Sequence, residues 1–299
     1  MGVVRTVRRG GRSERELVQT YRWEGQVHRK AVSLGPASGG SRVDLQTKLD
    51  QQIWDSTYLA LFDSIKAAVD ARNSASPKSL VEKEFDQFVL EFTYNTNRIE
   101  GSTLSLDDTR ELLQRHTVPR SKPLSDVLEA RAHAALFRRL VEHPEPLDLG
   151  RLLRWHRAIF GDTKPDIAGQ LRTVQVWIGG SKHIPPPPLE VKPVLVELLR
   201  RASRNRRGVN PVQLAAEFHL DFESVHPFVD GNGRIGRLAM NLLLARAGYP
   251  MVDIAYVKRK GYYSALEKSN LQGSARPFLR WFFLRYSRDH RRVLARSSK

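Results

Sequence analysis

The chain contains no cysteine among its 299 residues. This absence excludes disulfide bonds and every metal site that depends on a thiolate ligand. No apolar run approaches the roughly 20 residues that a membrane-spanning helix needs, and the first residues lack the apolar core of a secretory signal. We therefore expect a cytoplasmic protein without a membrane partner. The hydrophobic share of 40% supports a folded core, and the length predicts one large or two small domains.

Acidic residues are few compared with basic ones. There are 32 of the former and 49 of the latter, which gives a formal net charge of +17 at pH 7. Much of the excess lies at the two ends, in residues 1–42 and 281–299. Such ends favour nucleic acid or an acidic protein as a partner. A solvated arginine-rich surface explains the same composition at least as well, and no helix-turn-helix is recognisable after residue 275.

From about residue 44 onward, apolar residues recur at helical spacing. A long helix is predicted from near Leu45, and an aromatic stripe from Phe85 to Phe92 predicts another helix over about 81–101. The remaining predicted helices cover residues 106–116, 124–142, 148–160, 189–204, 211–225, 233–247, 259–270 and 276–295. The pattern indicates a mostly α domain over residues 44–299.

The first 43 residues differ from this helical pattern. Residues 1–16 are expected to be poorly ordered, and residues 17–32 are predicted to form a hairpin around a glycine turn. Residues 35–41, rich in glycine and serine, are expected to be a linker. The expected fold class is therefore a mostly α domain preceded by a short basic hairpin.

One segment interrupts the helices. Residues 172–180, with the sequence RTVQVWIGG, alternate β-branched and polar residues and end in a glycine turn. Four prolines at 185–188 then favour a rigid extended return. This pattern predicts a small β-hairpin inside the helical domain, and a plain connecting loop is the alternative.

The twelve residues 226–237, HPFVDGNGRIGR, carry the clearest chemical signal. Gly231 and Gly233 flank Asn232 and allow backbone N–H groups to approach an anion closely. The apolar run that follows predicts a helix, so this turn lies at a helix N-terminus. There, free N–H groups and the helix dipole favour phosphate.

Charged and titratable side chains in the same stretch suit group transfer from a polyphosphate. Arg234 and Arg237 lie three residues apart on one helical face and can both reach the phosphates. Asp230 is placed to hold Mg²⁺ against them. His226, with a pKa near neutrality, suits removal of a proton from a hydroxyl group. Phosphoryl-type transfer needs positioning and charge stabilisation more than covalent help, so these groups suffice.

The stretch resembles the Fic-family signature, HPFx(D/E)GNGRxxR, at every defined position. Fic proteins mostly transfer AMP from ATP to a hydroxyl side chain of another protein. The resemblance covers roughly residues 85–285, with a helical core at about 145–285. It implies that His226 deprotonates the target hydroxyl and that Asp230 binds Mg²⁺.

The resemblance also implies which residues bind the phosphates. Asn232 and the neighbouring glycine amides would hold the α-phosphate, Arg234 the β-phosphate and Arg237 the γ-phosphate. The ATP-binding residues implied within the motif are Asp230, Gly231, Asn232, Gly233, Arg234, Ile235, Gly236 and Arg237.

Two further segments gain a role from the resemblance. In Fic proteins a β-hairpin flap covers the active site, at the place of the hairpin predicted here, and pairs with the target backbone. The residues implied to line the nucleotide pocket or clamp the target are Val176, Trp177, Ile178 and Gly179. Tyr262 and Asn270, in the segment after the motif helix, would lie near the adenine.

A second motif precedes the first by more than a hundred residues. Thr96 and Glu100, followed by Gly101, fit the Fic inhibitory pattern (S/T)xxxE(G/N). On its own the pattern also describes a solvent-facing glutamate before a glycine cap. Beside the signature it implies that Glu100 pairs with Arg237 and withdraws it from the γ-phosphate, while Thr96 anchors the helix end.

These observations predict an enzyme that uses ATP and Mg²⁺ to adenylylate a Ser, Thr or Tyr hydroxyl of a target protein, and that is inhibited by Glu100. Removal of AMP from a modified protein, with Glu100 positioning a water molecule, uses the same residues and stays open. Nucleic-acid binding by the basic ends and assembly as a homodimer also stay open.

Overall fold

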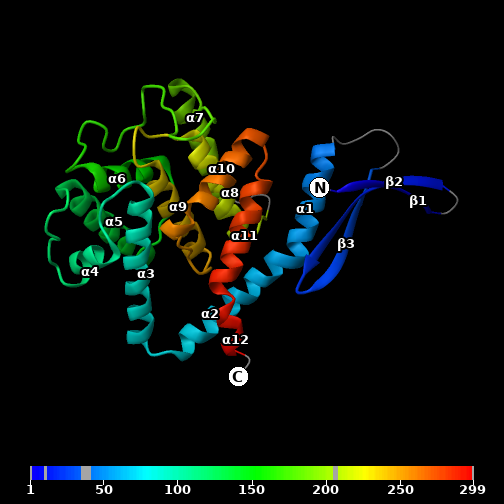
Figure 1. Ribbon diagram of the computed structural model, residues 1–299, viewed down its shortest axis with the longest axis horizontal. Coiled ribbons are helices and arrows are strands. Elements are labelled where there is room, and N and C mark those ends of the chain that lie inside the picture. Colours follow the sequence, from blue (N-terminus) through cyan, green and yellow to red (C-terminus); the bar gives the residue numbers. More distant parts are fainter. Residues whose placement is uncertain (1, 10–11, 35–41, 205–207, 298–299) are drawn as a thin grey trace. The chain divides into compact units, whose positions relative to one another are not determined.

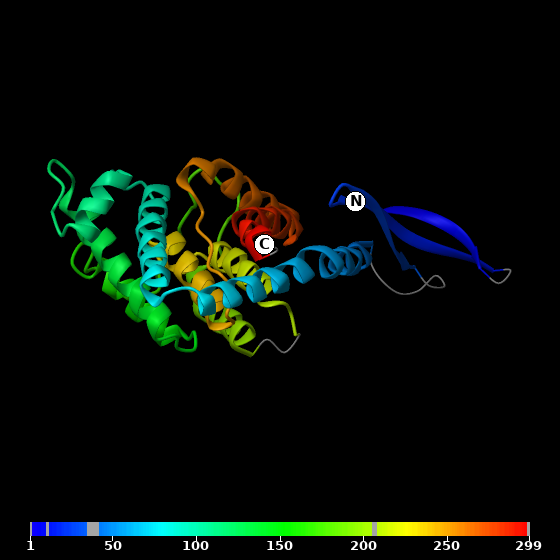
Figure 2. The ribbon, with the colours of Figure 1, turned by 90° about the horizontal axis from the view of Figure 1, so that it is seen from below.

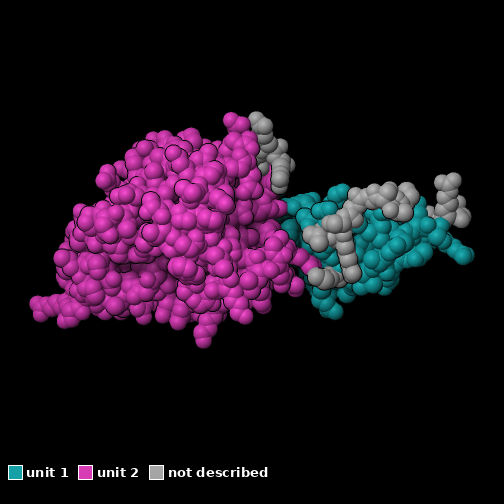
Figure 3. Space-filling model, turned by 90° about the horizontal axis from the view of Figure 1, so that it is seen from above, with its two compact units in different colours: residues 1–65 teal, residues 66–299 magenta. Residues whose placement is uncertain are grey.

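The computed structural model describes residues 2–9, 12–34, 42–204 and 208–297. The chain divides into two compact units, residues 1–65 and 66–299 (Figure 3). Most described residues are helical, and a three-stranded antiparallel sheet lies in the first unit. The expected fold class is thus confirmed, and the linker predicted over residues 35–41 lies outside the described residues.

The sheet of the first unit consists of β1 (Val3–Arg9), β2 (Arg12–Trp23) and β3 (Gln26–Ser33), paired in that order. The predicted hairpin is confirmed as β2 and β3, and both turn residues, Glu24 and Gly25, have the positive φ that a tight hairpin turn requires. The expectation of disorder before residue 17 is wrong for the described residues. They form β1 and the first half of β2, in which Val3 lies opposite Val18 and Arg5 lies opposite Glu16. Apolar pairs and pairs of opposite charge across neighbouring strands stabilise a sheet.

Helix α1 (Arg42–Trp54) buries Leu45, Leu49 and Ile53 against Leu17 of the sheet. A π-helical turn, Asp55–Leu59, joins it to α2 (Ala60–Ala75), so the long helix predicted from the apolar spacing is confirmed with one irregular turn. The Thr57 hydroxyl donates to the Ile53 carbonyl oxygen at 2.6 Å. Such a bond competes with the regular helix ladder and accompanies the wider turn.

The second unit is a bundle of helices around the motif (Figures 1 and 2). Its helices are α3 (Lys78–Ile99), α4 (Leu106–Gln114), α5 (Leu124–Glu142), α6 (Leu149–Phe160), α7 (Pro188–Arg204), α8 (Pro211–Val225), α9 (Asn232–Arg246), α10 (Arg259–Gln272), α11 (Arg276–His290) and α12 (Arg292–Ser297). The predicted helices α5 and α8 coincide with the observed ones, and most others differ by a few residues at their ends. The helix predicted over 276–295 is divided at Arg291 into α11 and α12.

Helix α9 lies at the centre of this unit, packed against α3, α5, α6 and α8 (Figure 1). Residues 232–244 are all buried, the polar side chains of Asn232, Arg234 and Arg237 included, because neighbouring helices surround this helix. Asn241, buried within it, accepts from the Val252 amide and donates to the Val252 carbonyl. The motif therefore stands on a rigid central element.

The β-hairpin predicted over residues 172–188 is not formed, and this prediction is wrong. Residues 172–187, all of them described, form an irregular flap segment with a glycine turn and no paired strands, and Pro188 begins α7. Side chains take the place of a ladder: Arg172 donates to the Pro186 carbonyl at 2.5 Å and Gln175 to the Pro185 carbonyl at 3.0 Å. The reason is the proline run, which has no N–H groups with which to pair.

Candidate active site

A pocket of ≈ 400 Å³ opens at the N-terminus of α9, bounded by the ends of α3 and α8, the flap segment and one face of α10. The sequence-predicted residues that line it are Glu100, Trp177, Ile178, Gly179, His226, Asp230, Gly231, Asn232, Gly233, Arg237, Tyr262 and Asn270. The tertiary structure thus brings together residues that are up to 170 positions apart in the chain. Arg234, Ile235, Gly236 and Val176 do not line the pocket.

His226 ends α8 in the left-handed conformation, with φ 49°. This backbone state is uncommon outside glycine and is found at functional sites. Its Nδ1 lies 3.3 Å from the Glu223 carbonyl oxygen, so Nδ1–H is the donor and Nε2 keeps its lone pair. Burial lowers the pKa of His226 below its ordinary value, against the opposing effects of that hydrogen bond and of the Glu100 charge. The ring is therefore a neutral base at neutral pH.

The loop between His226 and α9 is held from within. Asn232 accepts from the Phe228 amide at 2.8 Å and donates to the Phe228 carbonyl at 2.9 Å. Gly231 has φ 83°, and a Cβ there would overlap the Phe160 ring, so only glycine fits. The first turn of α9 consequently faces the pocket with N–H groups that have no partner within the helix. Such a turn suits a phosphate group.

Arg237 is buried and held by the end of α3. Its Nη2 donates to Glu100 Oε1 at 2.7 Å and its Nε donates to the Thr96 hydroxyl at 2.8 Å. The Glu100 carboxylate also lies over Gly233, because a Cβ at Gly233 would overlap Glu100 Oε1. The carboxylate thus occupies the space directly above the first-turn backbone, where an anionic ligand would otherwise bind.

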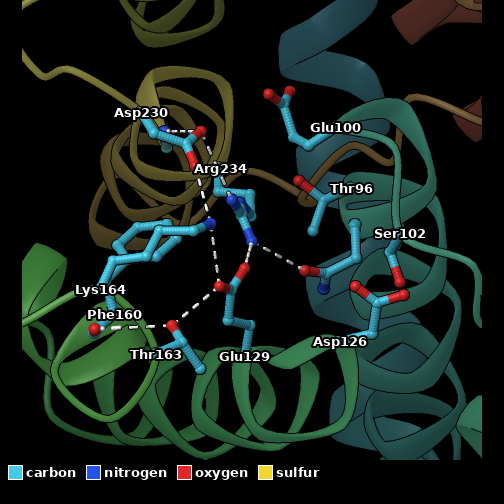
Figure 4. A network of polar contacts seen from close by, with 12 residues as sticks. Thr96, Glu100, Ser102, Asp126, Glu129, Phe160, Thr163, Lys164, Asp230 and Arg234 are labelled. Carbon is cyan, nitrogen blue, oxygen red and sulfur yellow. Dashed lines mark hydrogen bonds and ion pairs between the residues drawn. The ribbon is translucent and has the colours of Figure 1, made fainter. Parts of the chain in front are cut away.

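A second ion-pair cluster lies behind the pocket (Figure 4). Glu129 of α5 lies at its centre, where its carboxylate accepts from both Arg234 and Lys164. Lys164 in turn lies 2.7 Å from Asp230 Oδ2. The Arg234 guanidinium stacks 4.4 Å from the centroid of the Phe160 ring. The guanidinium group of Arg234 is therefore buried and bound to other protein groups, although the resemblance implies a phosphate contact for it.

The Fic/DOC family profile matches residues 146–244, a range that includes the whole motif. The chain contains a Fic/DOC domain. It is 32% identical to the protein adenylyltransferase Fic of Drosophila ananassae, over 86% of this chain and 52% of that protein. The same protein of Drosophila mojavensis is 32% identical, with 86% and 51% covered. The chain therefore spans about half the length of the curated relatives it matches.

Solved Fic structures share the fold. Fic-1 from C. elegans is 27% identical and superposes with a TM-score of 0.68 over 86% of this chain and 77% of that one. A Fic-domain signaling protein from Bacteroides thetaiotaomicron is 26% identical with a TM-score of 0.69, over 77% of this chain and 94% of that one. The family profile begins after α3, so Thr96 and Glu100 lie outside the range that it matches.

Asp230 is the carboxylate of the Fic motif, and its surroundings fit a divalent cation bound jointly with phosphate. Burial raises the pKa of Asp230, but hydrogen bonds and charge from Lys164 and Arg234 outweigh it, so the pKa is lowered and the group is ionised. No group of three or more potential metal-ligating side chains occurs within the described ranges. A Mg²⁺ site does not require such a cluster, because Mg²⁺ is commonly bound by one or two carboxylates together with phosphate oxygens and water.

Tyr262 lines the pocket and contacts two buried residues. Its hydroxyl lies 2.8 Å from His219 Nε2 and 3.5 Å from Arg237 Nη1. It therefore lies beside the arginine end of the pocket. Asn270, which the resemblance places near the adenine together with Tyr262, lines the pocket from the last turn of α10.

Arg172 is a positioning residue that sequence reasoning missed. It is 3% exposed, its Nε donates to the His226 carbonyl at 2.8 Å, and its guanidinium also binds the Val174 and Pro186 carbonyls. One side chain thus joins the flap segment to the backbone of the candidate base. The only sequence signal for it is an arginine within an apolar segment, and that signal is too common to be informative.

Glu129 is the second residue that the sequence did not reveal, and its replacement should lower the stability of the fold. Glu129→Ala removes the carboxylate in direct contact with the buried Arg234 and leaves, among the described residues, only that of Asp230, at 3.7 Å. The free energy of unfolding should therefore fall by up to about 3–5 kcal/mol. Urea denaturation measures this. Glu142→Ala, an exposed glutamate on the same helix, should change stability by no more than about 0.5 kcal/mol. Equal losses in the two variants would contradict the role of Glu129.

Proposed function

We propose that this Fic protein transfers AMP from ATP to a Ser, Thr or Tyr hydroxyl of a target protein and is inhibited by Glu100. The observation that carries the proposal is the arrangement of one pocket, in which a neutral His226 faces the N-terminal turn of α9 and Arg237. A base, an anion-binding backbone and a buried cation are what in-line transfer from a polyphosphate requires.

The proposed reaction is a displacement at the α-phosphorus of ATP. The target oxygen forms a bond to that phosphorus, its proton passes to His226 Nε2, and the bond to the β-phosphate oxygen breaks so that pyrophosphate leaves. The first-turn N–H groups of α9 hold the α-phosphate, and Arg237 stabilises the charge at the far end of the leaving group. Asp230 would hold Mg²⁺, which supplies charge stabilisation at the phosphates.

Intact-mass spectrometry tests the activity directly. The full chain carrying Glu100→Gly is incubated with ATP and Mg²⁺, and the same variant with His226→Ala serves as the control. If the protein modifies itself, Glu100→Gly should gain the mass of one AMP and the variant that also carries His226→Ala should gain none. This result supports AMP transfer. A phosphate gain, or no nucleotide bound at all, would contradict the proposal.

A second candidate activity is removal of AMP from a modified protein. It is favoured by one observation: the carboxylate of Glu100 and the ring of His226 line the same pocket, so that Glu100 is available to orient a water molecule. The bond broken would then be that between phosphorus and the target oxygen, with water as the nucleophile. A pre-adenylylated target incubated with wild-type protein separates this activity from transfer.

Asp230→Ala should weaken the dependence of ATP binding on Mg²⁺. The carboxylate is the only acidic side chain inside the motif loop, and its removal leaves the metal to phosphate and water alone. Calorimetry of ATP binding with and without Mg²⁺ measures the change, with Asp162→Ala as a matched control on the neighbouring loop. An unaltered Mg²⁺ dependence in Asp230→Ala would mean that the metal is held elsewhere.

A further inference from the structure

Glu223 is a buried acid in the pocket that the proposed reaction does not use. It lies one turn before His226 on α8 and lines the pocket, yet only 9% of its surface is exposed. Its Oε1 has no hydrogen-bond partner in the part of the chain that the structure describes. A buried carboxyl oxygen without a partner costs free energy. Glu223 also forms part of the pocket wall, so a ligand bound in the pocket could supply a partner that this carboxyl group lacks within the described protein.

Charged and titratable groups from three other helices face Glu223. Arg237 of α9 favours its ionised form, whereas Glu100 at the end of α3 opposes it. Burial raises the pKa of Tyr262 of α10, and the charge of Glu223 acts in the same direction. His219 Nδ1 on α8 lies 3.9 Å from Oε1. Burial dominates this set and raises the pKa of Glu223 to about 8. At neutral pH the carboxyl is protonated and carries an O–H donor.

Gly236 makes room for this acid. A Cβ at position 236 would lie 2.7 Å from Glu223 Oε1 and 3.1 Å from His219 Nδ1. Position 236 falls in the part of the signature where any residue is allowed. Glycine there lets α8 bring the Glu223 carboxyl against the backbone of α9, one residue before Arg237. The acid is therefore built into the arginine end of the pocket.

We propose that Glu223 binds the terminal phosphate of the nucleoside triphosphate, donating a hydrogen bond from its carboxyl O–H to a phosphate oxygen beside Arg237. This inference rests on the proposed function, because it requires a triphosphate in the pocket. A neutral donor adds a contact to the phosphate without cancelling the charge of Arg237. An ionised Glu223 would repel the phosphate and compete with it for Arg237.

The test is the pH dependence of nucleotide binding in the full-length chain. Glu100→Gly is the parent, because Glu100 otherwise holds Arg237, and Glu100→Gly with Glu223→Gln is the matched variant. Calorimetry gives the Kd of ATP with Mg²⁺ from about pH 6.5 to about pH 9.5. The parent binds with a protonated Glu223, so affinity should be full below the pKa and fall about tenfold per pH unit above it. Removing Glu100 removes one cause that raises the pKa, so the decline should begin at or below about pH 8.

The glutamine variant isolates the effect of Glu223. A carboxamide has the same shape and donates at every pH, so its affinity should match the parent at low pH and stay higher at high pH. Titration of ATP itself affects both proteins equally. AMP, which lacks the terminal phosphate, should bind both with the same pH dependence. Glu100→Gly with Glu223→Ala should bind ATP several-fold more weakly than the parent at low pH while AMP affinity is unchanged.

Two results would overturn the proposal. If the parent binds ATP equally well across the range, or if the glutamine variant shows the same decline, Glu223 does not contact the phosphate. If a folded parent, checked by its thermal unfolding, binds no ATP at any pH, both this inference and the proposed function fail. Binding without a difference between the two variants overturns only the role of Glu223.

Discussion

Replacement of His226 by alanine is expected to lower AMP transfer by about 10²–10⁴-fold, while ATP binding and the fold stay nearly intact. In the proposed reaction the ring removes a proton and holds no phosphate, so its loss should affect the chemical step. Transfer is measured with labelled ATP in the Glu100→Gly background, and binding is measured by calorimetry. His143→Ala, an exposed histidine at the end of α5, is the matched control and should leave the rate unaltered.

The pH profile of the same reaction gives an independent test of the base. Burial lowers the pKa of His226, and the base acts only when neutral. The rate should therefore be constant near neutral pH and fall as the pH drops through this lowered pKa. Near-normal transfer in His226→Ala, or a profile that declines already at neutral pH, would rule out His226 as the base.

Replacement of Glu100 by glycine is expected to raise AMP transfer by about 100-fold, the scale of effect that a displaced phosphate has on rate. Its carboxylate binds Arg237 and lies over Gly233, so its removal frees both the cation and the space above the backbone. Glu142→Gly, an exposed glutamate at a helix end, is the control and should have no effect on transfer.

A double-mutant cycle shows whether Glu100 acts through Arg237. If it does, Glu100→Gly combined with Arg237→Ala should return to low activity, and the two effects should be strongly non-additive. The Arg237 variants also need a thermal unfolding check, because the side chain is buried. A rise in transfer that persists without Arg237 would show that Glu100 blocks the site by volume alone.

Measurement on a pre-adenylylated target distinguishes the two candidate activities of Glu100. If the carboxylate only inhibits, Glu100→Gly gains transfer and wild type removes no AMP. If it orients water, wild type removes AMP and Glu100→Gly loses that activity. If Glu100→Gly alters neither rate, the carboxylate has no role in the chemistry and is only the polar end of α3.

The sequence by itself determined which residues form the motif of the candidate site and where most of the helices lie. The motif residues are close along the chain, so their spacing alone places His226, Asp230 and the glycine turn around one helix N-terminus. Helix bounds follow in the same way from local periodicity and caps, as α5 and α8 illustrate. These are short-range properties, and residue order fixes them.

The pairing of Arg237 with Glu100 was implied by the inhibitory motif, whereas only the tertiary structure decided which acid pairs with Arg234. Arg234 and Arg237 look equivalent on one helical face, yet Arg234 pairs with Glu129 of α5 and Arg237 with Glu100 of α3. Periodicity gives no information on which acid from a distant helix will face which arginine. Buried charges must be paired, and the partner depends on how the helices pack.

The backbone conformation of the flap segment also could not be predicted from local sequence. Its β-branched residues favour strands locally, but strand pairing needs donors, and the proline run supplies none. Arg172 instead ties the segment to the carbonyl of His226, across 54 residues of chain. Glu223 likewise reads as an ordinary helical glutamate in the sequence. Its burial beside Gly236 and Arg237 arises only when α8 packs against α9, because desolvation depends on the surroundings in the fold and not on the residue type.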